Sequence, residues 1–170
     1  MNSSVTPKNR LLPSLLLALG MAGTVGGALG FQHIGGYIPC ALCLLQRDPY
    51  YYGIPVAVLA AASAFFGGPA WLTRSLLVIV GVMMLVGAGL GVYHSGVEWH
   101  FWEGPATCST SAPGIARDAG SLLSELSTTK PPSCSDASFR FLGLSFAGWN
   151  VIASLILAAI AFGGARGKRA

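Results

Sequence analysis

Two cysteines lie close together in the stretch "IPCALCLLQRDPYYYGIP", residues 38–55. Cys40 and Cys43 form a Cys-x-x-Cys motif, and Arg47 follows one helical turn after Cys43, close to the start of a long apolar run. This spacing serves either redox-active dithiols or metal ligands, and the surrounding sequence has to decide between them. The chemistry to be explained is a reactive thiol pair beside a cation at the edge of an apolar segment.

A second, widely separated pair, Cys108 and Cys134, accounts for the remaining cysteines. Zinc usually takes four ligands in two close pairs, and no histidine stands at ligand spacing beside this second pair, so zinc is disfavoured. A disulfide across the Cys108–Cys134 loop would stabilise the fold by about 3–4 kcal/mol on the loop-entropy account. A Cys40–Cys43 disulfide would gain little on that account. A purely structural role remains the alternative, but the short pair indicates a function.

Arg47 lies on the same helix face as Cys43 if the apolar run is helical. Helix-terminal N–H groups and the nearby cation would both favour a thiolate on Cys43. In the simpler alternative, Arg47 only reaches toward the membrane surface or pairs with Asp48. The functional interpretation is that Arg47 stabilises negative charge on Cys43 and on a reduced acceptor beside it. Two electrons leaving a dithiol at a lipid boundary need a lipid-soluble acceptor, for which a quinone is the obvious candidate.

The elements that must position these residues are predicted from the charge distribution. The chain of 170 residues is 53% apolar and only 9% charged, where soluble domains carry about a quarter of charged residues. Four windows contain no Asp, Glu, Lys or Arg, and each exceeds the about 20 residues needed to cross a bilayer. Only helices satisfy the backbone of such segments in lipid. We predict an all-α membrane protein, a four-helix transmembrane bundle in which residues 1–170 form a single integral membrane domain, with spans at about 11–31, 49–67, 75–94 and 143–163.

Charged residues divide between the two ends of these spans. The bases at the span ends are Lys8, Arg10, Arg74, Arg166, Lys168 and Arg169, and the acids on the other side are Asp48, Glu98, Glu103, Asp118, Glu125 and Asp136. Because bases mark the cytoplasmic side, both termini are predicted to be cytoplasmic. The net charge of +4 is then a topology signal and not a nucleic-acid patch. A cleaved signal peptide in residues 1–30 is disfavoured, because its apolar stretch is too long and its loss would leave three spans.

This topology places both external loops, about 32–48 and 95–142, and therefore all four cysteines, outside the cytoplasm. Disulfides persist there and are rare in the cytosol, so two disulfides are expected. Within the longer loop, "PGIARDAGSLLSELSTT" has apolar residues at helical spacing, and a short interfacial helix is predicted there. The residues on its apolar face are Ile115, Leu122, Leu123 and Leu126.

Taken together, the chain resembles the bacterial disulfide bond formation protein B family, inner-membrane thiol:quinone oxidoreductases. The resemblance rests on "CALCLLQR" at the start of span two, Cys108 and Cys134 in the loop before span four, and "FLGLSFAGWN" leading into that span. It covers nearly the whole chain. The chain differs from some relatives at Gln46, where they carry an acidic residue.

The resemblance implies a mechanism. A periplasmic thioredoxin-fold dithiol oxidase, similar to disulfide bond formation protein A, would attack Cys108 and release Cys134. Cys134 would attack the Cys40–Cys43 disulfide at Cys40, leaving Cys43 as the thiolate that faces a quinone held by Arg47. His94 resembles a family histidine close to the quinone. The quinone would be ubiquinone or menaquinone, and the protein would lie in the bacterial inner membrane with its cysteines facing the periplasm.

Two other readings remain open. An enzyme similar to vitamin K epoxide reductase also sets a Cys-x-x-Cys motif against a quinone within four helices, although its sequence around the motif matches less well. A non-enzymatic tetraspan scaffold would use its disulfides only to fasten loops. Catalytic disulfides reduce readily and structural ones do not, so a redox titration of the thiols separates the scaffold from either enzyme.

Overall fold

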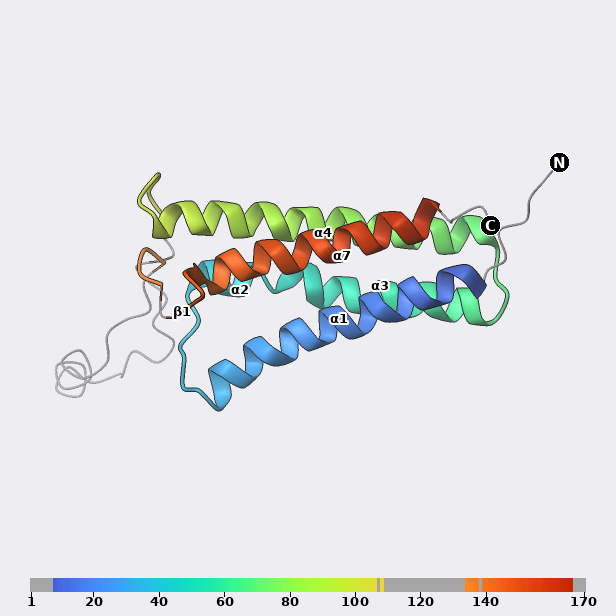
Figure 1. The fold of residues 1–170 in the computed structure, drawn as a ribbon, viewed down its shortest axis with the longest axis horizontal. Coiled ribbons are helices and arrows are strands. Elements are labelled where there is room, and N and C mark those ends of the chain that lie inside the picture. Colours follow the sequence, from blue (N-terminus) through green and yellow to red (C-terminus); the bar gives the residue numbers. More distant parts are fainter. Residues whose placement is uncertain (1–7, 107, 109–133, 138, 167–170) are drawn as a thin grey trace.

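The computed structural model describes residues 8–106, 108, 134–137 and 139–166. In this part of the chain, four long helices run lengthwise beside one another (Figure 1). They are α1 (Lys8–His33), α3 (Asp48–Phe65), α4 (Ala70–Glu98) and α7 (Phe146–Arg166), and the short helix α2 (Ala41–Leu45) precedes α3. Contacts join α1 to α3, α3 to α4, α4 to α7 and α7 back to α1, so the four long helices close into a bundle.

Three of these helices, α1, α4 and α7, are long and apolar enough to cross a membrane. Helix α3 is not among them, because Asp48, Pro49 and three tyrosines occupy its first turns. The fourth predicted span therefore exists as a helix in the bundle, and its crossing of the membrane stays a prediction. The observed helices also differ from the predicted spans at their ends. Most notably, α4 has 29 residues and continues to Glu98.

The bundle core is built from small and medium apolar residues. Its fully buried members include Leu17, Met21, Ala57, Ala60, Leu77, Val80, Met84 and Ala161. Glycines allow the helices to approach closely: a Cβ atom on Gly81 would lie 2.8 Å from the Phe162 ring, and one on Gly53 would lie 2.8 Å from the Met21 sulfur. Close packing over small residues is typical of helices in membranes.

Large apolar side chains cover the outside of the bundle. Those exposed by more than two thirds include Leu19, Tyr52, Phe65, Phe66 and Trp71. A soluble domain rarely exposes so extensive an apolar surface, whereas lipid would cover it without cost. The outer surface therefore supports membrane insertion independently of the charge-free windows.

A two-stranded hairpin, which the sequence analysis did not predict, precedes α7 in an otherwise mostly helical chain. Strand β1 (Arg140–Phe141) pairs antiparallel with β2 (Leu144–Ser145). The connecting residues, Leu142 and Gly143, have φ angles of 52° and 82°. Two left-handed residues in succession are characteristic of the tightest hairpin turns, and they keep helix α7 from starting before Phe146. The predicted interfacial helix lies outside the described residues.

Candidate redox site

All four cysteines lie together at one end of the bundle. Cys40, Cys43, Cys108 and Cys134 pack with Leu42 and Val97 into a small apolar cluster. A disulfide joins Cys108 to Cys134. Cys40 and Cys43 are free, with their sulfurs 2.8 Å apart, so the structure contains one of the two expected disulfides. This is a state in which the short pair is reduced and the long pair is oxidised.

The two sulfurs of the short pair have different surroundings. Cys40 caps helix α2, and its sulfur accepts the Cys43 backbone N–H at 3.3 Å. The ring atom His94 Nε2 lies 3.7 Å from the same sulfur. The contact between the sulfurs lowers the pKa of Cys40 and raises that of Cys43, so in the reduced pair with one proton the Cys43 thiol donates to a Cys40 thiolate. Cys40 is thus the preferred position for the negative charge of the reduced pair.

The acidity of the two thiols follows from these contacts. The hydrogen bond from the Cys43 side chain lowers the pKa of Cys40 to about 4, with His94 adding to the effect and burial opposing it. The same side-chain hydrogen bond, followed by burial, raises the pKa of Cys43, although Arg47 acts in the opposite direction. From the sequence, helix-terminal N–H groups and Arg47 were expected to favour a thiolate on Cys43. In the reduced pair this expectation is wrong, because the Cys43 backbone N–H and side chain both act on the Cys40 sulfur, which is the more acidic of the two.

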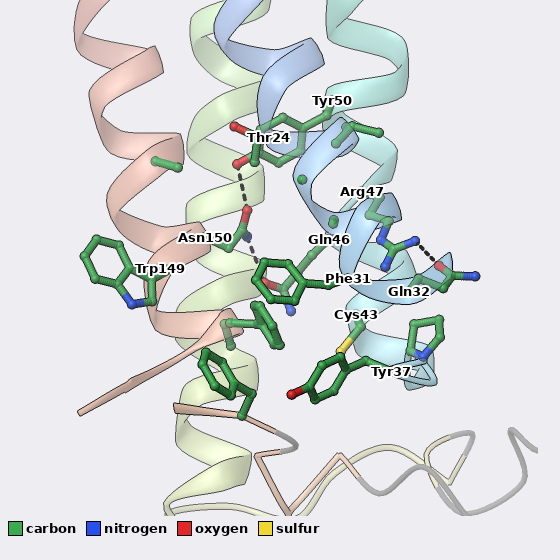
Figure 2. A pocket seen from close by; sticks show the side chains of 18 of the residues that line it. Thr24, Phe31, Gln32, Tyr37, Cys43, Gln46, Arg47, Tyr50, Trp149 and Asn150 are labelled. Atoms are coloured by element: carbon green, nitrogen blue, oxygen red, sulfur yellow. Dashed lines mark hydrogen bonds between the residues drawn. The ribbon is translucent and has the colours of Figure 1, made fainter. Parts of the chain in front are cut away.

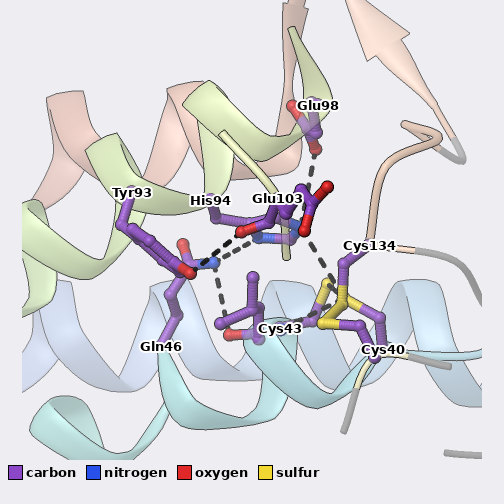
Figure 3. Close-up of a disulfide and its surroundings, with 10 residues drawn as sticks. Cys40, Cys43, Gln46, Tyr93, His94, Glu98, Glu103 and Cys134 are labelled. Atoms are coloured by element: carbon purple, nitrogen blue, oxygen red, sulfur yellow. Dashed lines mark hydrogen bonds and ion pairs between the residues drawn. A yellow bond between two sulfur atoms is a disulfide. The ribbon is translucent and has the colours of Figure 1, made fainter. Parts of the chain in front are cut away.

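Cys40 also lies next to the long pair. Ligand atoms of Cys40, His94 and Cys134 all fall within 4.8 Å of one another, and all three residues are buried (Figure 3). Three such groups could hold a soft metal ion, but the Cys134 sulfur is bonded to Cys108 and is not a thiolate here. The same proximity permits thiol–disulfide exchange between the two cysteine pairs, in which a thiolate of one pair attacks a disulfide sulfur of the other.

His94 lies on the last turns of α4 and is 3% exposed. Its Nδ1 atom is 2.6 Å from Gln46 Nε2, and its Nε2 atom is 3.8 Å from Glu98 Oε1. His94, Glu98 and Cys40 line a small cavity that also reaches Cys43 and Asp136. The structure therefore brings His94 to the Cys40 sulfur.

A second, larger cavity of about 720 Å³ opens between α1 and α7 (Figure 2). Cys43 and Arg47 contribute to its wall, whereas His94 does not. Arg47 donates a hydrogen bond to Gln32 Oε1 on α1 at 2.6 Å. Among the described residues no ion pair joins Arg47 to Asp48, so the structure does not contain the pairing alternative, whereas the alternative in which Arg47 only reaches toward the membrane surface stays open. We call this cavity the groove.

Several aromatic residues that line the groove contact one another. The Phe31 and Phe146 ring centroids are 5.0 Å apart, and those of Phe139 and Phe146 are 5.7 Å apart. Tyr37 packs edge-on against Phe31 at 6.0 Å. Arg47, Gln32 and Asn150 are among the few residues that place polar atoms on mostly apolar walls. A site of this kind suits a flat, apolar ring with a few polar substituents.

Sequence reasoning missed several polar residues of the site. Gln46, Tyr50 and Asn150 form a hydrogen-bonded series, in which Asn150 Nδ2 donates to Gln46 Oε1 at 2.8 Å and the Tyr50 hydroxyl donates to Asn150 Oδ1 at 2.6 Å. A signal was present in the sequence. Asn150 is a polar residue within an apolar span, and such residues usually face the bundle interior and serve a function.

The fold and the cysteine site together describe a membrane protein built for thiol–disulfide chemistry. The family model for disulfide bond formation protein DsbB matches residues 10–163, and the chain belongs to this family. It is a disulfide-forming membrane oxidoreductase of helical architecture.

Individual relatives agree with this assignment. The disulfide bond formation protein B of Acidovorax sp. (strain JS42) is 31% identical over 156 residues, covering 87% of this chain and 84% of the relative. The protein of the same name from Aromatoleum aromaticum is 26% identical over 161 residues, covering 85% and 88%. The one from Marinobacter nauticus is 28% identical over 145 residues, covering 81% and 80%. No solved structure gives a significant match.

Proposed function

We propose that this protein is a thiol:quinone oxidoreductase of the bacterial inner membrane. It reoxidises a periplasmic thioredoxin-fold dithiol oxidase, similar to disulfide bond formation protein A, and passes two electrons through its cysteine pairs to a membrane quinone. One observation carries the proposal: Cys40 lies within exchange distance of Cys134, while its neighbour Cys43 lines the groove that contains Arg47. The short pair thus connects the long pair to an apolar site.

The first steps exchange disulfides without net oxidation. One thiolate of the partner attacks Cys108, forming a mixed disulfide and releasing the Cys134 thiolate. Cys134 attacks Cys40 of the oxidised short pair, so a Cys40–Cys134 bond forms and the Cys43 thiolate leaves. The second partner thiol resolves the mixed disulfide and frees Cys108, which then restores the Cys108–Cys134 bond and releases Cys40. The partner leaves with a disulfide, and the short pair holds the two electrons.

The surroundings of Cys43 support this order. In the reduced pair, the leading causes of its raised pKa are its side-chain hydrogen bond to Cys40 and burial. Once the Cys40 sulfur is bonded to Cys134, it can no longer carry a negative charge or hold that hydrogen bond. The influence of Arg47, which lowers the pKa of Cys43, then has less to oppose it. Forming the bond between the pairs thus favours a thiolate beside the groove.

The groove fits a quinone. Phe31, Tyr37 and Phe146 provide apolar ring faces, and the Arg47 guanidinium provides a donor and a positive charge for an oxygen that gains charge. A bound quinone supplies the oxidising equivalents, taking up two electrons and two protons to become the quinol. Arg47 would hold its oxygen, the aromatic residues its ring, and Cys43 would present the reacting sulfur.

The distribution of bases supports the proposed orientation. Arg10 donates to the Ala70 carbonyl oxygen at 2.9 Å, so the start of α1 lies beside the α3–α4 connection, close to Arg74. Arg166 ends α7 at the same end of the bundle, opposite the cysteines (Figure 1). Bases at one end and redox-active thiols at the other are the arrangement expected when the thiols face the periplasm.

The test is quinone reduction by the purified protein. With a soluble quinone analogue and a reduced thioredoxin-fold partner, the wild-type protein should oxidise two partner thiols for each quinone that it reduces. Cys43→Ser should abolish turnover while leaving the Cys108–Cys134 disulfide able to react with the partner. Turnover unaffected by Cys43→Ser would overturn the proposal. A scaffold would show no quinone consumption at all, and its short pair would stay oxidised under mild reductant.

A further inference from the structure

Gln46 occupies the junction between α2 and α3 and is 6% exposed. Its amide nitrogen lies 3.3 Å from the Leu42 carbonyl oxygen and 2.6 Å from His94 Nδ1. Its amide oxygen accepts a hydrogen bond from Asn150 Nδ2 at 2.8 Å. The side chain therefore links three helices, α2, α4 and α7. It contacts the nitrogen of His94 opposite the one that faces the Cys40 sulfur.

The orientations of the two amides are set by groups that can only accept. The Leu42 carbonyl requires the nitrogen of Gln46 on its side. Asn150 Nδ2 likewise faces the Gly87 carbonyl oxygen at 3.3 Å. Turning either amide over would set an amide oxygen against a carbonyl oxygen, at the cost of the buried hydrogen bond. Gln46 must then present an N–H to His94.

This contact determines which nitrogen of His94 carries the proton. Because Gln46 donates to Nδ1, that atom must accept, and the proton of the neutral ring resides on Nε2. The Nε2–H group faces the Cys40 sulfur at 3.7 Å and Glu98 Oε1 at 3.8 Å. A ring in the other tautomer would turn a lone pair toward both of these groups.

We propose that Gln46 is a positioning residue, which holds His94 in the Nε2–H tautomer so that the ring donates to the Cys40 sulfur. The effect of this positioning on turnover rests on the proposed function. A thiolate stabilised by a donor is the better leaving group, and Cys40 is the sulfur that must leave when Cys108 restores the Cys108–Cys134 bond. The amides of Gln46 and Asn150 orient the ring through their hydrogen bonds and do not exchange protons with it.

Other groups act on the same sulfur and enter the test. The Cys43 backbone N–H donates to it at 3.3 Å, and the Cys43 sulfur lies 2.8 Å away. Glu98 and Asp136 line the same small cavity from α4 and from the segment after Cys134. Glu98 competes for the Nε2–H, and its Oε2 atom is buried without a hydrogen bond among the described residues. Because the Glu98 carboxylate lies close to the Cys40 sulfur and would repel a thiolate there, the His94 Nε2–H between the two is all the more important for stabilising the thiolate.

The direct test is nitrogen NMR of the histidine rings in ¹⁵N-histidine-labelled, reduced wild-type protein, with His94 assigned through His94→Asn. The proposal expects a protonated Nε2 and an unprotonated Nδ1. A protonated Nδ1 with a bare Nε2 overturns it. No partner or quinone takes part, so this result is independent of whether the proposed function holds.

The second test is a mutant cycle on the acidity of Cys40, followed by alkylation rate against pH in the reduced protein. Gln46→Leu and His94→Asn should each slow Cys40 labelling by about tenfold in the acid range, the effect of one pKa unit. The double variant should be no slower than His94→Asn alone. Additive losses, or no loss with Gln46→Leu, overturn the proposal. Ser63→Ala, which removes a hydroxyl bonded to Thr73 at the far end of the bundle, is the control and should change nothing.

Discussion

Cys40 and Cys43 are only three positions apart, yet their surroundings assign them different tasks. The Cys40 sulfur receives hydrogen bonds and lies beside Cys134, whereas the Cys43 sulfur lies on the wall of the groove. One sulfur is therefore suited to exchange with the long pair and the other to reaction with a ligand in the groove. A Cys-x-x-Cys motif at the start of a helix turns its two sulfurs toward different neighbours, which makes this division of tasks possible.

The first prediction concerns the reactivity of the reduced pair. Because the pKa of Cys40 is lowered to about 4, its thiolate persists from neutral pH down to that value, and only below it should the labelling rate fall with each unit of pH. Iodoacetamide should modify Cys40 in strong preference to Cys43, whose pKa is raised. Mass spectrometry of digested protein measures both rates. A midpoint near the ordinary thiol value of 9.0 for Cys40 would contradict the assignment.

The second prediction concerns Arg47. Replacing it with alanine should lower quinone reduction by about tenfold or more, as expected from the loss of a charge-assisted hydrogen bond of about 1.5–3 kcal/mol. Lysine should restore part of the rate, because it keeps the charge.

The control for this prediction is Gln32→Leu, which removes the 2.6 Å partner of Arg47 but leaves the cation in place. Steady-state kinetics with a quinone analogue and thermal unfolding in detergent give the two readouts. If Arg47→Ala lowers the melting temperature but leaves the quinone kinetics unchanged, its role is structural.

At the scale of helices, contact between α4 and α7 aligns the site. Gly91 lies at a close contact between the two helices, since a Cβ atom there would lie 2.7 Å from Val151 Cγ2 and 3.1 Å from the Ala147 carbonyl oxygen. Asn150 Nδ2, on the same stretch of α7, reaches Gln46 and the Gly87 carbonyl oxygen. The small residue thus allows the approach that brings Asn150 to Gln46.

The third prediction compares two glycines on this helix. Gly91→Ala should destabilise the protein by about 1–3 kcal/mol, the usual cost of overpacking. Gly89→Ala is the matched control, because nothing lies within 4 Å of a Cβ atom at that position. The control should be neutral or stabilising, since alanine favours helix. Denaturant unfolding in detergent measures the stability of both variants. Equal effects would contradict the prediction and show that α4 and α7 can move apart at Gly91 without loss of stability.

The positions of the helices could be predicted from the sequence, because segments free of charge are what a bilayer requires. The residues at which the helices end were harder to predict. Glu98 looked like the end of a span, but α4 carries it buried beside His94, where it faces a partner. The contact between Gln46 and His94 joins residues 48 positions apart and depends on how α2 packs on α4, which no periodicity encodes. The two cysteine pairs could be identified from the sequence alone, because the residue type and the spacing directly indicate their chemistry.

At the scale of the whole molecule, the bundle is not uniform along its length. Helix α1 diverges from α7 toward the end that carries α2 (Figure 1). Residues of both helices line the groove. The opposite end is closed by small residues, with Gly164 packed against Pro13. The cysteine cluster lies at the open end, so in the proposed mechanism only the Cys40–Cys43 disulfide would separate a quinone in the groove from Cys134.

The last prediction concerns topology, because α3 alone among the long helices is not apolar enough to count as a span. Four crossings return both termini to the cytoplasm, while three would leave them on opposite sides. Green fluorescent protein fused to either terminus should fluoresce, and alkaline phosphatase fused at either terminus should be inactive, since the first functions only inside and the second only outside. Phosphatase fused after Glu103 is the positive control and should be active. An active phosphatase at the C-terminus alone would mean that α3 packs in the bundle without crossing, and Cys40 and Cys43 would then no longer share a side with both the long pair and the partner.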